Sequence, residues 1–327
     1  MDKSCSEIKG GEAMKEIGGY IELDTYRGEL LHEGAVSLNC GRNALAYIIR
    51  SRNIKSILLP YFLCSSVLNV CKKENVQIRY YYIGRDFLPI DIKTQSDEWL
   101  YVVNYYGQIS NSKIKEMQQK YHNIIIDNAQ AYFQMPVEDI DTLYTCRKYF
   151  GVADGAFLYT DAILEGKLPM DESFNRMHFL LGRYERTASE FYNEYSENNH
   201  FFADEPIKQM SKLTANLLHG IDYDFVKKSR TENFAYLHKC FESANKLILT
   251  VPEGAFMYPL YIENGVEIRK KLQAKKIYIP TLWPDVFEIC SEDQPEYDMA
   301  MNILPLPIDQ RYGIKDMEYL VEVIQNV

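Results

Sequence analysis

The sequence has 327 residues, of which 46% are hydrophobic and 25% are charged. These proportions are ordinary for a globular protein, and they exclude a disordered chain, a coiled coil and a collagen-like fibre. The formal net charge of −10 argues against general nucleic-acid binding, which requires a basic surface. A chain of this length can bury a large core and favours one large and one smaller domain.

Membrane insertion and secretion are not expected for this chain. Its longest apolar runs, such as residues 56–64, are far shorter than the ~20 residues that a spanning helix needs. Residues 1–19 are polar and contain no signal-peptide core. The seven cysteines include no CxxC pair, and no HExxH motif occurs, so neither a metal site nor a disulfide framework is expected. We therefore predict reduced thiols and a cytoplasmic protein.

The first half of the chain alternates helix-like and strand-like segments. Helices are expected at 43–51, 65–74 and 111–121, and strands at 57–59, 77–83, 100–104, 123–126 and 156–159. This alternation is typical of a mostly parallel, doubly wound α/β sheet, in which ligands bind at the carboxyl ends of the strands. Asp127 directly follows one of these strands, so we expect it at that edge.

The second half of the chain changes character twice. Residues 165–240 are polar and helical, whereas short strands and helices return at 247–251, 257–262, 266–274, 277–280, 303–305 and 314–324. This pattern predicts a smaller α+β domain packed on the first. We place the large domain at 1–240 and the small domain at 241–327.

The first of three chemically informative patterns is Gly41-Arg42-Asn43, between an expected strand and a helix. A helix start offers free backbone N–H groups and the positive end of the helix dipole, which suit a phosphate group. The alternative interpretation is a simple helix cap provided by Asn43, and the pattern alone does not decide between them.

The second pattern is an isoleucine-rich segment that ends in Asp127, with Gln130 three residues later. A carboxylate beside the core is costly unless a charged or hydrogen-bonding group pairs with it. That group could be a helix N-terminus or the protonated ring nitrogen of a cofactor.

The third pattern surrounds Lys148, which follows Arg147 and precedes two aromatic residues and two glycines. A neighbouring positive charge and an apolar setting both favour the neutral form of an amine, which suits a Schiff-base role. The alternative is an ordinary surface Arg-Lys pair. The adjacent Cys146 has no histidine near it in the sequence, so a cysteine nucleophile is disfavoured.

Together and in this order, the patterns resemble the DegT/DnrJ/EryC1/StrS family of pyridoxal-phosphate-dependent sugar aminotransferases. The resemblance extends to the segments PYFLCSSVLN at 60–69, NYYG at 104–107 and LPLP at 304–307, and to the 21-residue separation of Asp127 and Lys148. It implies the aspartate aminotransferase (type I) fold, with a mostly parallel sheet in the large domain and a smaller C-terminal α+β domain.

The resemblance also implies roles for individual residues. Lys148 would form a Schiff base with pyridoxal 5'-phosphate and move a proton, while Asp127 would pair with the pyridinium nitrogen. Cys64 occupies the position that stacks on the ring, with Phe62 or Tyr61 as alternatives. The implied cofactor-binding set is Gly41, Arg42, Asn43, Cys64, Asp127, Gln130, Thr145 and Lys148: the helix-start backbone and Thr145 would bind the phosphate, and Gln130 would contact the ring.

Several departures mark a divergent member. Arg42 stands where the family has a small hydroxyl residue, and Val-Ala-Asp-Gly follows Lys148 where the family has Gly-Glu-Gly-Gly. The family's Asn-Tyr-Arg signature is replaced by the segment that begins at Met210. The substrate pocket therefore cannot be inherited by analogy.

The function implied by the resemblance is transfer of an amino group from an amino acid such as glutamate to a keto-sugar, nucleotide-linked, in a homodimer without nucleic-acid or membrane partners. Two alternatives stay open. One is a non-transaminating, dehydratase-like relative, although Lys148 argues against the version in which histidine replaces the lysine. The other is a catalytically silent scaffold or binding protein, against which the presence of Lys148, Asp127 and Gln130 argues. A Rossmann dehydrogenase is disfavoured because no GxGxxG follows a strand.

Overall fold

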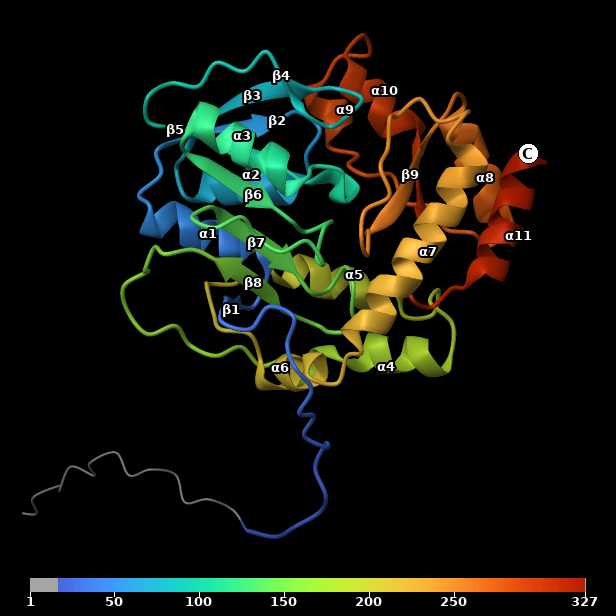
Figure 1. The fold of residues 1–327 in the computed structure, drawn as a ribbon. Coiled ribbons are helices and arrows are strands. Elements are labelled where there is room, and N and C mark those ends of the chain that lie inside the picture. Colours follow the sequence, from blue (N-terminus) through green and yellow to red (C-terminus); the bar gives the residue numbers. More distant parts are fainter. Residues whose placement is uncertain (1–16, 327) are drawn as a thin grey trace, which may run out of the picture.

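An eight-stranded sheet organises the first part of the computed structural model, which describes residues 17–326 (Figure 1). Its strand order is β1-β8-β7-β6-β5-β2-β3-β4. The strands are β1 (Val36–Leu38), β2 (Ser56–Pro60), β3 (Gln77–Ile83), β4 (Pro89–Ile90), β5 (Glu98–Val103), β6 (Ile124–Asp127), β7 (Asp141–Thr145) and β8 (Ala156–Tyr159). The five strands from β7 to β3 in this order pair in parallel, whereas β1, β8 and β4 pair antiparallel. The predicted mostly parallel α/β architecture is thus confirmed.

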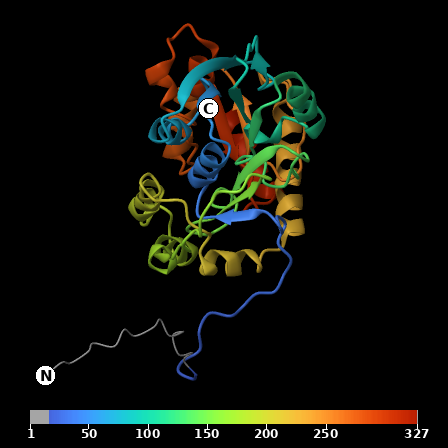
Figure 2. The same cartoon turned by 90° about the vertical axis from the view of Figure 1, so that its left-hand side faces the viewer.

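Helices cover the sheet on both faces. They are α1 (Gly41–Ser51), α2 (Ser65–Lys73) and α3 (Asn111–Tyr121), with the short 3-10 turn η1 (Tyr105–Gly107) after β5. Figure 2 shows α1 and α2 on one side of the sheet and α3 on the other. The apolar side of α1, including Leu45 and Ile48, is buried against the sheet. Each of the three α-helices overlaps a helix expected from the sequence, although α1 begins at Gly41, two residues before the expected start.

Strand β7 is the one central strand that the sequence pattern does not predict. It begins at Asp141, a residue type that is rare in strands. The structure explains this exception, because the Asp141 carboxylate is buried and accepts two hydrogen bonds from the Arg52 guanidinium, the shorter at 2.8 Å. Burying a charged side chain in a sheet destabilises the fold much less when an opposite charge pairs with it than when it is isolated.

The polar segment at 165–240 is helical, as predicted. Its elements are η2 (Phe174–Arg176), α4 (His178–Glu185), α5 (Tyr192–Phe201), α6 (Lys212–Leu218) and α7 (Tyr223–Phe241). The second half of α7 packs into a separate apolar core through Phe234, Leu237 and Phe241. The proposed domain boundary after residue 240 stays a prediction.

That second core belongs to a small α+β unit beside the sheet (Figure 1). Its elements are β9 (Met257–Tyr261), α8 (Gly265–Ala274), α9 (Val286–Ile289), α10 (Pro295–Asn302), β10 (Ile303–Pro307) and α11 (Ile314–Gln325). Strands β9 and β10 pair antiparallel. The expected elements at 247–251 and 277–280 are wrong, since both stretches are irregular in the structure.

Six cysteines fall within the described residues, and all six are free thiols. Cys5 and most of the polar segment 1–19 lie outside the described residues. Across residues 17–326, no helix combines the length and the apolar character needed to cross a membrane.

His32 anchors the segment before β1 inside an aromatic cluster. The side chain is 1% exposed, and its ring lies 4.1 Å from that of Tyr144. Nε2 donates to the Tyr132 carbonyl at 2.9 Å, so Nδ1 faces the Tyr159 hydroxyl at 3.3 Å as an acceptor. Burial lowers the pKa of His32 to about 4. The native state therefore holds this imidazole neutral.

This arrangement predicts an acid-sensitive fold. Because the native pKa of His32 lies below the unfolded value of about 6.5, its stabilisation is complete above pH 6.5 and is lost as the pH falls towards 4. The loss is at most about 3 kcal/mol. Urea unfolding from pH 7.5 to 4 measures it, with His32→Phe as the control. The variant is expected to unfold more easily at pH 7.5 but to lose less stability on acidification; equal pH slopes for both proteins would contradict the assignment.

Candidate active site

The carboxyl ends of the parallel strands bring the predicted site residues to one edge of the sheet. Asp127 ends β6 and pairs with Val103 of β5 on one side and with Leu143 of β7 on the other. Thr145 lies two residues beyond Leu143 and ends β7. The register therefore makes Asp127 and Thr145 neighbours on adjacent strands, as expected for a ligand site in an open α/β sheet.

Asp127 is fixed by two hydrogen bonds. Its Oδ2 accepts from the Tyr101 hydroxyl at 2.7 Å, and its Oδ1 accepts from the Ala129 backbone N–H at 2.8 Å. Burial and the adjacent carboxylate both raise the pKa of Tyr101 well above its usual value, so the hydroxyl stays a donor. Each carboxylate oxygen has a second lone pair, and Asp127 is 8% exposed. The carboxylate is held in place and can accept one more donor.

Gln130 points towards the NYYG loop. Its Oε1 accepts from the Tyr106 backbone N–H at 2.8 Å, and the residue is buried. Tyr106 has a φ of 52°, in the left-handed region that disfavours a bulky side chain. The bond from Gln130 helps to hold this strained turn. No partner for Gln130 Nε2 occurs among residues 17–326, so this amide group remains available to a ligand.

The start of α1 meets the end of β7. A Cβ atom on Gly41 would lie 3.8 Å from Cβ of Thr145, so the two residues face each other closely. The capping residue of α1 is Cys40, not Asn43. The Asn43 side chain instead donates to Asn39 at 2.9 Å and to the Pro206 carbonyl at 2.7 Å. The alternative in which Asn43 caps the helix is therefore wrong.

Two arginines add positive charge at the same place. Arg42 Nη1 donates to the Asn199 carbonyl at 2.9 Å, and Arg147 Nη2 donates to the Asn199 side-chain oxygen. Burial raises the pKa of the Cys40 thiol at the start of α1, and the positive charges of Arg42 and Arg147 oppose this rise. Desolvation lowers the pKa of Arg147 to about 10. Within residues 17–326 neither arginine has a carboxylate partner, so their charges favour an anion near the start of α1.

Lys148 is exposed in the single chain. Its Nζ lies 5.4 Å from the centre of the Phe256 ring, and it forms no ion pair with the described residues. The preceding Arg147 is mostly buried, so the two residues are not an ordinary surface pair. The aromatic residues that follow, Tyr149 and Phe150, are buried and anchor the backbone beside Lys148.

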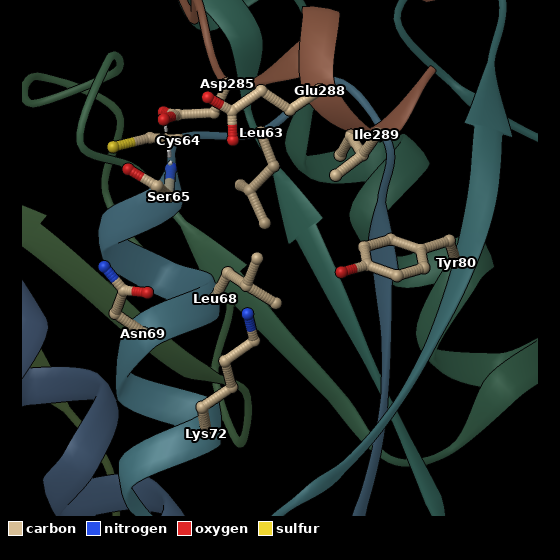
Figure 3. Close-up of a pocket in the computed structure, with 10 residues that line it drawn as sticks. All are labelled: Leu63, Cys64, Ser65, Leu68, Asn69, Lys72, Tyr80, Asp285, Glu288 and Ile289. Carbon is tan, nitrogen blue, oxygen red and sulfur yellow. Dashed lines mark hydrogen bonds between the residues drawn. The ribbon is translucent and has the colours of Figure 1, made fainter. Parts of the chain in front are cut away.

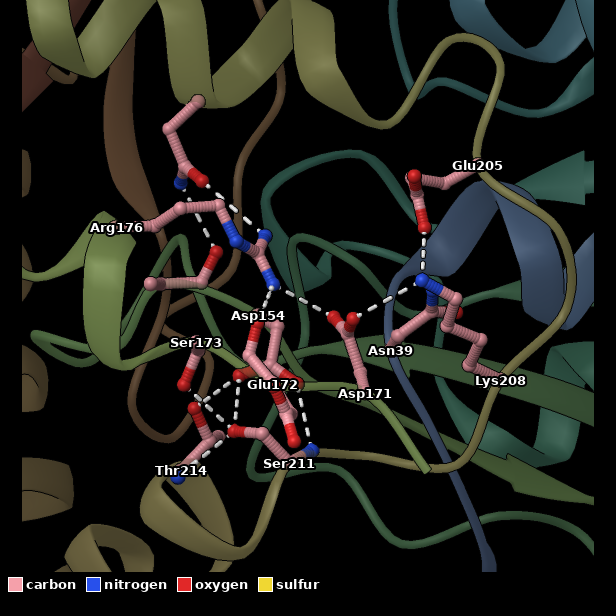
Figure 4. A network of polar contacts seen from close by, with 12 residues as sticks. Asn39, Asp154, Asp171, Glu172, Ser173, Arg176, Glu205, Lys208, Ser211 and Thr214 are labelled. Atoms are coloured by element: carbon pink, nitrogen blue, oxygen red, sulfur yellow. Dashed lines mark hydrogen bonds and ion pairs between the residues drawn. The ribbon is translucent and has the colours of Figure 1, made fainter. Parts of the chain in front are cut away.

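The loop that carries Lys148 is tied to α6 through Asp154. This carboxylate is fully buried and accepts from the Ser211 backbone N–H at 2.7 Å and from the Ser211 hydroxyl at 2.8 Å. It also accepts from the Thr214 hydroxyl. Figure 4 shows these bonds converging on Asp154. Asp154 stands within the stretch where the sequence departs from the glycine-rich pattern, and it fixes the end of the loop.

Cys64 follows the end of β2 by four residues and caps the start of α2. Its Sγ lies 2.9 Å from the Ser66 hydroxyl. Cys64 lines a cleft of about 140 Å³ between α2 and α9 (Figure 3). Asp285, just before α9, accepts a hydrogen bond from the Ser65 N–H at 3.1 Å in this cleft. No residue of the Lys148 loop lines this cleft.

The two alternatives to Cys64 are engaged elsewhere. Phe62 is fully buried against Trp283, and the Tyr61 ring stacks on that of Tyr80 with centres 4.9 Å apart. Sequence reasoning missed Tyr101 and Asn199, which hold Asp127 and Arg147. For Tyr101 a signal existed, since it lies two residues before the end of the neighbouring strand; for Asn199 none did.

Comparison with known proteins supports the architecture. No protein-family model and no curated protein matches the sequence. Among solved structures, DesV of S. venezuelae, in complex with a ketimine intermediate, is 15% identical with a TM-score of 0.64, covering 89% of this chain and 84% of its own. A DegT DnrJ EryC1 StrS aminotransferase from Brucella abortus is 13% identical with a TM-score of 0.61, covering 91% and 86%.

A third similar structure is the PLP form of the putative sugar aminotransferase Spr1654 from Streptococcus pneumoniae. It is 14% identical with a TM-score of 0.62, and the match covers 90% of this chain and 88% of that one. At these identities the likeness shows the fold. The predicted resemblance to the DegT/DnrJ/EryC1/StrS structures is thus confirmed at the level of the fold.

Proposed function

We propose that this protein is an aminotransferase that uses pyridoxal 5'-phosphate to transfer an amino group to a keto-sugar. The observation that carries the proposal is the convergence of Asp127, Thr145 and the start of α1 at one sheet edge, with Lys148 in the next loop. The neighbouring structures with this fold, including a PLP form of a putative sugar aminotransferase, add support.

The residues at this edge fit the cofactor in three ways. The phosphate suits the start of α1 with the Thr145 hydroxyl, because Gly41 leaves room between them and Arg42 and Arg147 supply uncompensated positive charge. The ring nitrogen suits Asp127, which retains a free lone pair on a fixed carboxylate. The aldehyde suits the amine of Lys148, which forms no ion pair with the described residues.

Each residue then has a defined task in amino transfer. When bound, the cofactor supplies a ring that withdraws electrons from the carbon whose proton is exchanged. Asp127 favours the protonated ring nitrogen, since an opposite charge stabilises the charged form. Once the amino donor has displaced it from the cofactor aldehyde, the Lys148 amine would take the proton from one carbon and return it to another. Gln130 Nε2 is free to donate to the ring hydroxyl, and Cys64 would lie against the ring face.

The finer terms of the proposal concern substrate and location. We propose a nucleotide-linked keto-sugar as the acceptor, an amino acid such as glutamate as the donor, and the cytoplasm as the location, all from the resemblance. We also propose a homodimer. Large apolar side chains are exposed on the segment before β1 and on α4, including Ile17 at 94% and Tyr184 at 93%. Sedimentation should give twice the 38.2 kDa of one chain.

An absorbance titration tests the enzyme proposal. Adding pyridoxal 5'-phosphate to the purified protein is expected to give a visible band from the covalent link to Lys148, and adding glutamate is expected to bleach it. A screen of amino donors covers the case in which glutamate is not the donor. A protein that gains no band would contradict cofactor binding and favour a silent scaffold. A band that no donor bleaches would contradict amino transfer and favour a non-transaminating relative.

A further inference from the structure

Two successive asparagines of α5 contact both elements of the proposed cofactor site. Asn198 Nδ2 donates to the Ala153 carbonyl of the Lys148 loop at 2.9 Å. Asn199 accepts from Arg147 through its side chain and from Arg42 through its carbonyl, the latter at 2.9 Å. Since Arg42 belongs to α1 and Arg147 to the Lys148 loop, Asn199 links the two elements directly.

The C-terminal end of α5 is held in place by further contacts. Arg176 donates to Asn198 Oδ1 at 3.3 Å and pairs with the buried Asp171 at 2.7 Å. Figure 4 shows Arg176 reaching the Asp171 carboxylate. The guanidinium groups of Arg147 and Arg176 also lie over the ring of the buried Phe202, at 4.9 and 5.0 Å. The asparagines are therefore fixed points and not flexible surface groups.

The lysine loop, residues 146–155, is held by bonds within it and by bonds from other elements. The Tyr149 carbonyl accepts from Gln310 Nε2 at 2.8 Å, and the Gly155 N–H donates to the Asn39 carbonyl at 2.7 Å. The Cys146 N–H donates to the Gly155 carbonyl at 3.1 Å, which closes the loop at its ends, and the Phe150 N–H donates to the Cys146 carbonyl at 2.9 Å. Arg147 has no carboxylate partner in the described part of the chain, so its orientation depends on Asn199 and on the Phe202 ring. Helix α5 thus holds the loop at Arg147 and at Ala153, on either side of the buried Tyr149 and Phe150.

We propose that Asn198 and Asn199 are positioning residues that hold the lysine loop against the start of α1 and thereby orient Lys148. The reactive role of Lys148 rests on the proposed function, whereas the clamp on the loop does not. This assigns a task to a helix from the polar segment in which the sequence shows no catalytic motif. Neither asparagine needs to touch substrate or cofactor.

The two asparagines bind the loop in opposite roles, one as a hydrogen-bond acceptor and the other as a donor. The same substitution at each position can therefore test the proposal. Asn199 acts on the loop as an acceptor, so an aspartate there can still accept from Arg147. Asn198 acts as a donor to Ala153, and an ionised aspartate cannot donate. The same substitution at neighbouring positions is therefore expected to have opposite results: Asn199→Asp retains the clamp, whereas Asn198→Asp breaks it.

Hydrogen exchange on the cofactor-free protein tests the clamp without reference to catalysis. In Asn199→Ala and Asn198→Asp, amides of residues 146–155 are expected to exchange about tenfold faster than in the wild type, and in Asn199→Asp at close to the wild-type rate. Asn233→Ala is the matched control: Asn233 is buried, as Asn198 is, and donates to two carbonyls, those of Ile308 and Tyr312, but in the second core. Unchanged exchange in Asn199→Ala, or equal acceleration in the Asn233→Ala control, would overturn the clamp.

The loaded protein tests the orientation of Lys148. The pH midpoint of the visible band is expected to shift in Asn199→Ala, to return in Asn199→Asp, and to stay unchanged in Asn233→Ala. A midpoint that does not move despite faster loop exchange would overturn the positioning of Lys148. A wild type without any band would count against the proposed function, and the exchange results would still decide the clamp.

Discussion

Replacing Lys148 with alanine is expected to lower amino transfer at least about a thousandfold and to remove the visible band. The reason is chemical: the side chain supplies both the amine that binds the cofactor aldehyde and the base that moves the proton. Because Lys148 is exposed and forms no ion pair with the described residues, its loss is expected to change the free energy of unfolding by less than about 0.5 kcal/mol. Single-turnover kinetics and urea unfolding measure the two effects.

Two further variants test whether Lys148 acts through its neutral amine or only through its positive charge. Lys148→Arg keeps a positive charge but cannot supply a neutral amine near neutral pH, so it is expected to be as inactive as the alanine variant. Lys120→Ala is the matched control, since Lys120 is also exposed and lies 4.8 Å from the centre of an aromatic ring, that of Tyr121. Appreciable transfer by Lys148→Arg would mean that only the charge is needed.

Replacing Asp127 with asparagine is expected to slow the half-reaction with the amino donor at least about a hundredfold, because a neutral amide does not favour the protonated ring nitrogen. The asparagine keeps the shape and can still accept a hydrogen bond from Tyr101 or Ala129. The expected loss of unfolding free energy is therefore modest, about 1–2 kcal/mol. Stopped-flow absorbance and urea unfolding measure the two quantities on the same preparation.

Tyr101→Phe provides the comparison for Asp127. It removes the 2.7 Å hydrogen bond to Oδ2 but leaves the carboxylate. We expect a similar cost in stability, about 1–2 kcal/mol, with less than about a tenfold loss in the half-reaction. If both variants lose stability and activity in the same proportion, Asp127 has only a structural role at the end of β6.

The sequence predicts the elements that depend on local periodicity. Helix α3 has the predicted bounds, and the isoleucines of β6 are buried up to Asp127 as the apolar run indicates. Strand β7 was not predicted, because the charge that begins it is compensated by Arg52, which is distant in sequence. The order of the motifs predicted that the site residues lie at one edge of the sheet. The register of β6 and β7 agrees, since it makes Asp127 and Thr145 neighbours.

The supports of the site could not be derived in the same way. Asn199 lies 52 residues from Arg147 and 157 from Arg42, and no periodicity connects positions so far apart. The partners of Asp127 could not be derived from the sequence either. The sequence left open a helix N-terminus or a cofactor as the partner, whereas the structure shows the Tyr101 hydroxyl and the Ala129 backbone amide. The departure at 152–155 places Asp154 in a buried network that the glycine-rich pattern of relatives does not suggest.

Chemical trapping tests the central claim most directly. Reducing the protein with borohydride in the presence of pyridoxal 5'-phosphate, followed by digestion and mass spectrometry of the peptides, identifies the lysine that carries the cofactor. The account predicts one dominant pyridoxyl adduct, on Lys148, that glutamate or another active donor added before reduction diminishes. An adduct spread over exposed lysines such as Lys120, or a Lys148 peptide that stays unmodified, would contradict it.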